Sequence, residues 1–145
     1  MAITQAIANS FKKELLEGDH DFDTGADVFK LALYTSAATL DSSTTTYTST
    51  GEVSASGQYV AGGGALVNSG TSIVGGVAFC DFADLSFTGV TLTARGALIY
   101  NTSATVANAA VAVLDFGSDK TATDGTFTIQ FPADTSTAAI LRIGN

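Results

Sequence analysis

The hydrophobic positions at the start of the chain recur every four residues. The recurring positions are Ile3, Ile7, Phe11 and Leu15. This spacing is typical of an amphipathic helix with one apolar stripe. Gly18 follows the last of these positions, and glycine commonly stands just past the end of a helix. The pattern therefore predicts a helix over residues 1–17.

From residue 28 onward, short segments alternate hydrophobic and polar positions, as β-strands with one buried face do. The segments are VFKLALYT, VAFCDF, TLTARGALIYN, AVAVLDF, TFTIQF and ILRI. The run AVAVLDF is almost entirely apolar, which indicates a central strand covered on both faces. The pair Asp124-Gly125 is a common hairpin turn, and it predicts a turn just before TFTIQF.

These elements amount to one N-terminal amphipathic helix and about seven or eight strands, separated by turn residues. No helices alternate with the strands, which excludes a parallel βαβ arrangement. The sequence predicts a mainly β protein, an antiparallel β-sandwich or barrel with the helix packed on one face or end. We expect a single domain over residues 1–145, with its β part over residues 28–145.

Residues 35–57 are rich in serine and threonine and contain few core-forming side chains. A segment of this kind is either a disordered loop or an arm that becomes ordered on a partner. Three consecutive glycines follow at residues 62–64, where we expect a strand or turn in which two backbones approach closely. The residues that we expect at a partner interface are Thr44, Thr45, Tyr47, Tyr59, Gly62, Gly63 and Gly64.

Charge limits the choice of partners. Fourteen acidic and six basic residues give a net charge of −8, and the pI is about 4.2. Such a chain is repelled by phosphate groups, so we expect no nucleic-acid partner and no anionic membrane surface. Charged residues make up only 14% of the chain, against about 25% in typical globular proteins. A surface of small, neutral side chains suits close packing in an assembly.

The N-terminus has neither the basic start nor the apolar run of a signal peptide, and no apolar stretch approaches the length of a membrane span. We therefore expect a protein that is made in a cytoplasm and has no membrane partner.

The acidic stretch GDHDFDTGAD, residues 18–27, raises the question of a metal site. Asp19, Asp21 and Asp23 have the spacing of the first half of a calcium loop. The sixth position is then Thr24 instead of glycine, and the twelfth is Lys30 instead of a bidentate glutamate. We therefore interpret the stretch as a solvated acidic loop and leave a weak cation site at the three aspartates as the alternative. No cofactor is expected.

The side chains that could support catalysis are few. Cys80 is the only cysteine and stands in an apolar strand, and His20 is the only histidine that could activate it. Two of the acids Asp81, Asp84 and Asp115 could lie close enough together to hydrolyse sugars, but sugar sites usually add tryptophan, and this chain has none. We expect Arg95 to pair with Asp81 or Asp115. The sequence thus predicts a protein that is not an enzyme, with no catalytic residues.

Four stretches taken together resemble a family of small virion proteins encoded by tailed bacteriophages, marine and cyanobacterial phages among them. The stretches are MAITQAIANSFKKELLEG, VFKLALYTSAATL, RGALIYN and AVAVLDFGSDKTATDGTFTIQFP. The resemblance spans nearly the whole chain, and its specificity lies in the combination. It implies a structural role in the virion and brings no catalytic motif.

The resemblance and the charge lead to one expected function and two alternatives. We expect a capsid decoration or cement protein on the outer shell, assembled as a homo-oligomer and bound to the major capsid protein or other virion proteins. It would be made in the host bacterial cytoplasm and located in the virion. The first alternative is a tail component, such as a tube, adaptor or fibre-base protein. The second is a carbohydrate-binding module, which would show exposed aromatic side chains in a cleft. The sequence does not bring the four tyrosines together.

Overall fold

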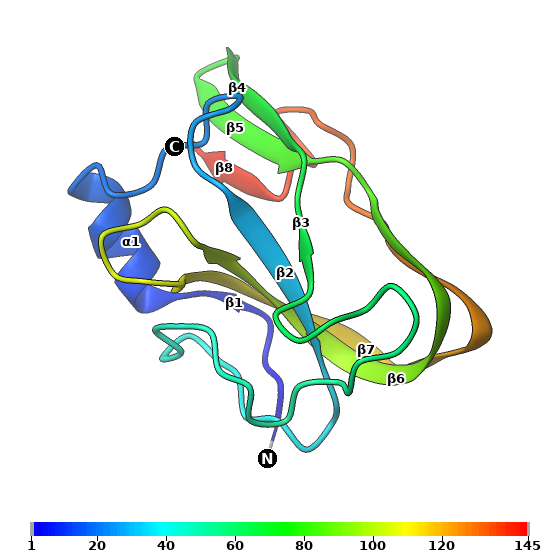
Figure 1. Ribbon diagram of the computed structural model, residues 1–145. Coiled ribbons are helices and arrows are strands. Elements are labelled where there is room, and N and C mark those ends of the chain that lie inside the picture. Colours follow the sequence, from blue (N-terminus) through cyan, green and yellow to red (C-terminus); the bar gives the residue numbers. More distant parts are fainter. Residues whose placement is uncertain (1, 145) are drawn as a thin grey trace.

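Two antiparallel sheets and one short helix make up the computed structural model, which describes residues 2–144 (Figure 1). The larger sheet has the order β1-β7-β6-β2-β3, and the smaller sheet has the order β4-β5-β8. The larger sheet consists of β1 (Ala6–Ile7), β7 (Ala109–Ile129), β6 (Leu85–Asn101), β2 (Phe29–Tyr34) and β3 (Gly64–Ala65). The smaller sheet consists of β4 (Asn68–Val74), β5 (Val77–Phe82) and β8 (Leu141–Ile143). The mainly β, antiparallel fold class with one N-terminal helix is confirmed.

The core lies along the hairpin of β6 and β7, which pair along almost their whole length. Strand β7 is buried without a break from Ala109 to Val113, where it lies between β1 and β6. This burial confirms the prediction for the apolar run AVAVLDF. Farther along β7, Phe127 and Ile129 are buried and their neighbours are exposed, as alternation predicts.

The hairpin turn predicted at Asp124-Gly125 is wrong, because both residues lie within β7. Gly125 is opposite Val90, and the register of the β6–β7 ladder shifts on both sides of this pair. Asp124 has a φ of 45°, and its N–H donates a 3.0 Å hydrogen bond to the hydroxyl of Thr91. The left-handed residue therefore makes a bulge in a continuing ladder instead of a turn.

The helix is shorter than predicted. Helix α1 spans Asn9–Leu16, and the residues before it are extended. The N–H of Thr4 donates to the carbonyl of Leu40, and the N–H of Ala8 donates to that of Val111. Apolar residues four apart also fit a strand, whose period is two, so the spacing at Ile3 and Ile7 could not exclude extended backbone. Among residues 2–144, no helix is long and apolar enough to cross a membrane.

Residues 35–57 are packed on the rest of the chain, which corrects the prediction of a disordered loop or a partner-dependent arm. Ala38, Leu40 and Val53 are buried in the core. The backbone makes isolated bridges to the strands, from Thr46 to Ala109 and from Glu52 to Tyr34. The prediction failed because it was based on the low hydrophobicity of the segment. A few buried side chains and backbone hydrogen bonds to the strands are enough to order it.

The close backbone approach predicted at the three glycines is confirmed at Gly63. A Cβ atom at this position would lie 1.7 Å from the carbonyl oxygen of Leu31, and Gly63 has a φ of +78°. Both the contact and the conformation therefore require glycine. Gly64 then continues into β3, which pairs with β2.

Candidate functional site

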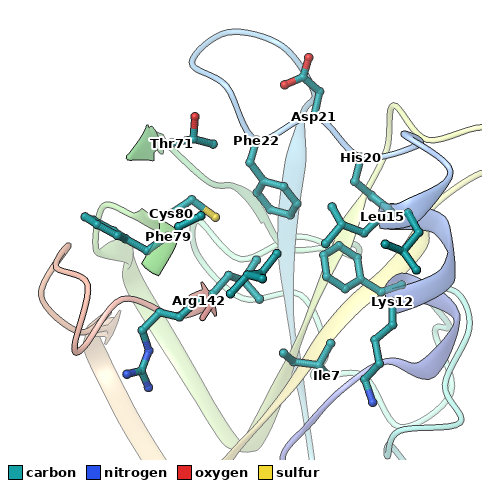
Figure 2. Close-up of a pocket in the computed structure, with 15 residues that line it drawn as sticks. Ile7, Lys12, Leu15, His20, Asp21, Phe22, Thr71, Phe79, Cys80 and Arg142 are labelled. Atoms are coloured by element: carbon teal, nitrogen blue, oxygen red, sulfur yellow. The ribbon is translucent and has the colours of Figure 1, made fainter. Parts of the chain in front are cut away.

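An apolar groove with a volume of about 540 Å³ lies between helix α1 and the three-stranded sheet (Figure 2). We call it the apolar groove throughout. One wall comes from β1, α1 and the segment that follows α1, and the other comes from β4, β5 and β8. Its lining consists of Ile7, Phe11, Lys12, Leu15, Leu16, His20, Asp21, Phe22, Thr71, Ala78, Phe79, Cys80, Leu141, Arg142 and Ile143.

The helical wall follows from the second half of the predicted stripe. Phe11 and Leu15 are four residues apart and face the same side of α1. The ring of Phe11 is buried, and it meets Phe22 edge-on at a centroid distance of 5.8 Å. Leu16 stands at the rim of the wall and is 91% exposed, although it is a large apolar side chain. The helix thus offers one covered apolar stripe and a single uncovered leucine beside it.

The sheet wall is built from two cross-strand rows, because residues directly opposite each other in antiparallel strands share a face. The inner row consists of Thr71, Cys80 and Leu141, and the outer row consists of Ile73, Ala78 and Ile143. Cys80 and Leu141 pack against the core. Ile73 is 71% exposed and Ile143 is 64% exposed. The apolar face of the small sheet therefore continues beyond the part that the core covers.

Charged side chains stand at opposite ends of the apolar groove. In Figure 2, the carboxylate of Asp21 points outward at one end, and the charged groups of Lys12 and Arg142 point outward at the other. Lys12 donates to the side-chain oxygen of Asn9 at 3.2 Å, and Arg142 donates to the carbonyl of Thr137 at 2.7 Å. The ion pairs found over residues 2–144 involve neither cation. Both positive charges therefore remain available to a partner.

Hydrogen bonds of His20 anchor the segment that follows α1. Its imidazole is buried, with Nε2 3.1 Å from a carboxylate oxygen of Glu14 and Nδ1 2.9 Å from the side-chain nitrogen of Asn101. Nε2–H then donates to Glu14, and Nδ1 accepts from Asn101. The same nitrogen of Asn101 also donates to Asp27 at 2.7 Å. This network ties α1 and the acidic loop to the end of β6 and makes one end of the apolar groove rigid.

Cys80 is a buried wall residue, as predicted from its strand. Burial raises the pKa of the thiol to about 12, and the nearby carboxylates of Asp81 and Asp134 raise it further. A thiol with this pKa is protonated near neutral pH and is a poor nucleophile. Both ring nitrogens of His20 are already engaged by Glu14 and Asn101. The geometry therefore gives no support to a cysteine–histidine pair.

The three aspartates of the acidic stretch have separate partners. Asp19 accepts hydrogen bonds from the hydroxyl and the N–H of Thr105, at 2.6 and 2.9 Å, and these bonds lower the pKa of its carboxyl group. Asp21 accepts from the N–H of Asp23, whose own carboxylate accepts from the N–H of Thr24. Within residues 2–144, no three histidine, cysteine, aspartate or glutamate side chains form a group that could hold a metal ion.

The other acidic candidates are also engaged in structural contacts. Arg95 donates a 3.0 Å hydrogen bond to Asp115, which confirms the second of its two predicted pairings and lowers the pKa of Asp115. Asp84 accepts from the N–H of Phe131 at 2.8 Å. Asp81 is buried, and burial raises the pKa of its carboxyl group. The bonds of Asp115 and Asp84 thus hold a strand pair and a strand end.

The interface predicted from the sequence is largely inside the protein. Tyr59, Gly62 and Gly63 are buried and cannot form a surface for a partner, so the prediction is wrong for these residues. Gly64, Thr44 and Tyr47 are half-buried, and only Thr45 of this set is exposed. The prediction failed because flexibility was inferred from composition, whereas these residues are held by contacts with distant strands.

The structure brings the four tyrosines together around Glu52, which sequence reasoning missed. Tyr47 and Tyr59 donate hydrogen bonds to its carboxylate at 2.6 and 2.8 Å. Tyr100 stacks on Tyr47 at 5.0 Å and donates to the carbonyl of Gly62, and Tyr34 donates to the carbonyl of Thr48. Their hydroxyls are turned into this cluster. The cluster therefore does not form the exposed aromatic platform that a carbohydrate-binding module requires.

Comparisons of the chain with protein families, with curated proteins and with solved structures found no match. The residues of the chain and the apolar groove are therefore the features that bear on function. The sequence predicted the helical stripe that forms one wall. It gave no signal for the groove itself, because the opposite wall comes from strands about sixty residues and more farther along the chain.

Proposed function

We propose that this chain is a non-enzymatic structural protein of a tailed-phage virion, which decorates the outer surface of the capsid as an oligomer. The observation that carries the proposal is the apolar groove, because it is a built surface with uncovered apolar side chains on both walls. The resemblance of nearly the whole chain to phage virion proteins points to the same role. The partners would be further copies of the chain and the major capsid protein.

The apolar groove supports a role in assembly. Large apolar side chains that cluster on a surface usually mark a site where another molecule binds. Leu16, Ile73 and Ile143 are each more than half exposed and lie on or next to the groove. Covering them would remove apolar area from water, which contributes about 25 cal/mol per Å².

The charge supports a position on the outer surface. With a net charge of −8, the protein would be repelled by packaged DNA if it lined the inside of the capsid. On the outside, the same charge keeps neighbouring particles apart in solution. A tail component would also assemble through an apolar surface, so binding to the shell is the property that separates the two roles.

Co-sedimentation with empty shells, assembled from the major capsid protein, tests the proposal. We expect the purified protein to bind and to saturate at a fixed ratio to the capsid subunit. Leu16→Asp should abolish binding, because it places a charge on the rim of the apolar groove. Val106→Asp is the matched control, because Val106 is an exposed apolar residue that does not line the groove. Absence of binding by the wild-type protein, or equal binding by the Leu16→Asp variant, would contradict the proposal.

A further inference from the structure

We propose that the apolar groove is a two-fold interface and that its occupant is the same groove of a second copy of this chain. This inference rests on the proposed function, since it names the partner of the assembly surface. In a two-fold contact, each molecule contributes the same patch, so the patch must be complementary to itself. The apolar groove meets this condition in its apolar residues, its shape and its charge.

The exposed apolar residues gather on this face. Nine large apolar side chains are exposed over residues 2–144, and four of them lie on the apolar groove or on the sheet face that extends it. These four are Ile7, Leu16, Ile73 and Ile143. The remaining five are all valines. Large apolar side chains on both sides of one groove gain most when a single partner covers them together.

The shape of the small sheet suits entry into a second groove. The outer row of Ile73, Ala78 and Ile143 lies beyond the row that packs on the core. The β4–β5 hairpin ends at Gly75 and Gly76, and a Cβ atom at either glycine would have no heavy atom within 4 Å. The end of the sheet is therefore slim, and it carries apolar side chains on the same face that forms the groove wall. Each copy can place this end against the helical wall of the other.

The charges favour the two-fold arrangement. Asp21 stands at one end of the apolar groove, and Lys12 and Arg142 stand at the other (Figure 2). A two-fold axis through the middle of the groove reverses the direction of the second copy. Asp21 of one copy then faces the two cations of its partner, and the same pairing occurs a second time at the other end. Opposite charges at the rim of an interface determine its orientation and exclude wrong partners.

A pair of charge variants tests this arrangement. Asp21→Lys makes both ends of the groove basic, and the double variant Lys12→Glu with Arg142→Glu makes both ends acidic. We expect the wild-type protein to have twice the 14.7 kDa mass of one chain in light scattering. Each variant alone should raise the dissociation constant about tenfold or more, because like charges then meet twice in the interface. An equimolar mixture of the two variants should restore the dimer as a heterodimer.

Separate control measurements test whether the variants fold and whether the loss of the dimer is specific to the groove. The altered side chains lie at the rim, so each variant should keep the melting temperature and circular dichroism of a folded monomer. Ile73→Asp should give a monomer by another route, whereas Val106→Asp should leave the dimer unchanged. A monomeric wild-type protein, a dimer unaffected by Ile73→Asp, or a mixture that stays monomeric would overturn the inference. Shell binding by a monomeric wild-type protein would overturn the dimer and leave only the binding to the shell in place. A wild-type dimer that does not bind shells would contradict the capsid role and leave the dimer in place.

Discussion

The hydroxyl of Tyr59 donates a 2.8 Å hydrogen bond to the carboxylate of Glu52, which also accepts bonds from the hydroxyl of Tyr47 and the N–H of Gly62. Three donors on both sides of Glu52 in the chain thus converge on its carboxylate. Because Tyr59 is fully buried against β2, this carboxylate ties residues 35–63 to the core. The relationship explains why a segment with the composition of a flexible arm is ordered.

Replacing Glu52 by alanine should destabilise the protein, because it leaves three donors without their acceptor. We expect the free energy of unfolding to fall by about 1.5–3 kcal/mol, the range for hydrogen bonds to a charged group. Urea denaturation followed by circular dichroism measures the change. Glu17→Ala is the control, since Glu17 is exposed and pairs only with Lys13, and it should alter stability by less than about 0.5 kcal/mol. An equal change in the free energy of unfolding for the two variants would show that the hydrogen bonds to Glu52 do not stabilise the fold.

Stability should decrease at high pH as the tyrosine cluster titrates. Burial, followed by the charge of Glu52, raises the pKa of Tyr100 to about 12, and burial and the bond to Glu52 do the same for Tyr47. The pKa values of Tyr34 and Tyr59 are raised as well. The folded protein therefore holds these protons more tightly than the unfolded chain, whose tyrosines titrate near about 10.

It follows that the contribution of this cluster to the free energy of unfolding should be level below about pH 10 and should fall as the pH rises toward about 12. Tyrosinate absorbance of the folded protein should rise later than that of free tyrosine. The Glu52→Ala variant should release its tyrosine protons at lower pH than the wild-type protein. Absorbance that rises near pH 10 while the protein remains folded would contradict the burial of the cluster.

Gly63→Ala should prevent folding or reduce stability by more than about 3 kcal/mol, because the new Cβ atom would lie 1.7 Å from the carbonyl oxygen of Leu31. Gly75→Ala is the matched control. Gly75 also has a positive φ, of +59°, but no atom within 4 Å of the added carbon, so it should cost about 1 kcal/mol. The melting temperatures of the two variants distinguish the cost of the steric clash from the cost of the left-handed backbone conformation, because only Gly63→Ala has both. Similar melting temperatures would show that the glycine turn can move away from β2.

Calcium should have no effect on stability, because Asp19, Asp21 and Asp23 direct their carboxylates to different hydrogen-bond donors. We expect the same melting temperature in calcium and in a chelator. An ion that bound the folded state alone would stabilise it in proportion to its occupancy. A melting temperature that rises steadily with added calcium would restore the weak cation site as the better interpretation.

The local pattern predicted the parts of the fold that depend on periodicity. Most of the longer strands and the continuous burial of Ala109–Val113 follow from residues that are close in sequence. The pairing of Arg95 with Asp115 was one of two predicted alternatives, and the ladder places Asp115 opposite the neighbouring Gly96. The predicted start of the helix was wrong, because the spacing of Ile3 and Ile7 suits a strand equally well. The acceptor role of Glu52 and the apolar groove were both missed. The apolar groove depends on contacts between segments that are far apart in the chain. The donors to Glu52 are only five to ten residues from it, but they lie in a segment without hydrophobic periodicity, so no short pattern records either feature.

The central claim is that this protein is a structural component of a virion, and its copy number tests the claim most directly. Virions of the source phage that the claim requires would be purified and digested, and the chain would be quantified by mass spectrometry against the major capsid protein. We predict a copy number comparable to that of the major capsid protein. A small number that matches the symmetry of a tail would move the protein to the tail, and its absence from purified virions would contradict a structural role altogether.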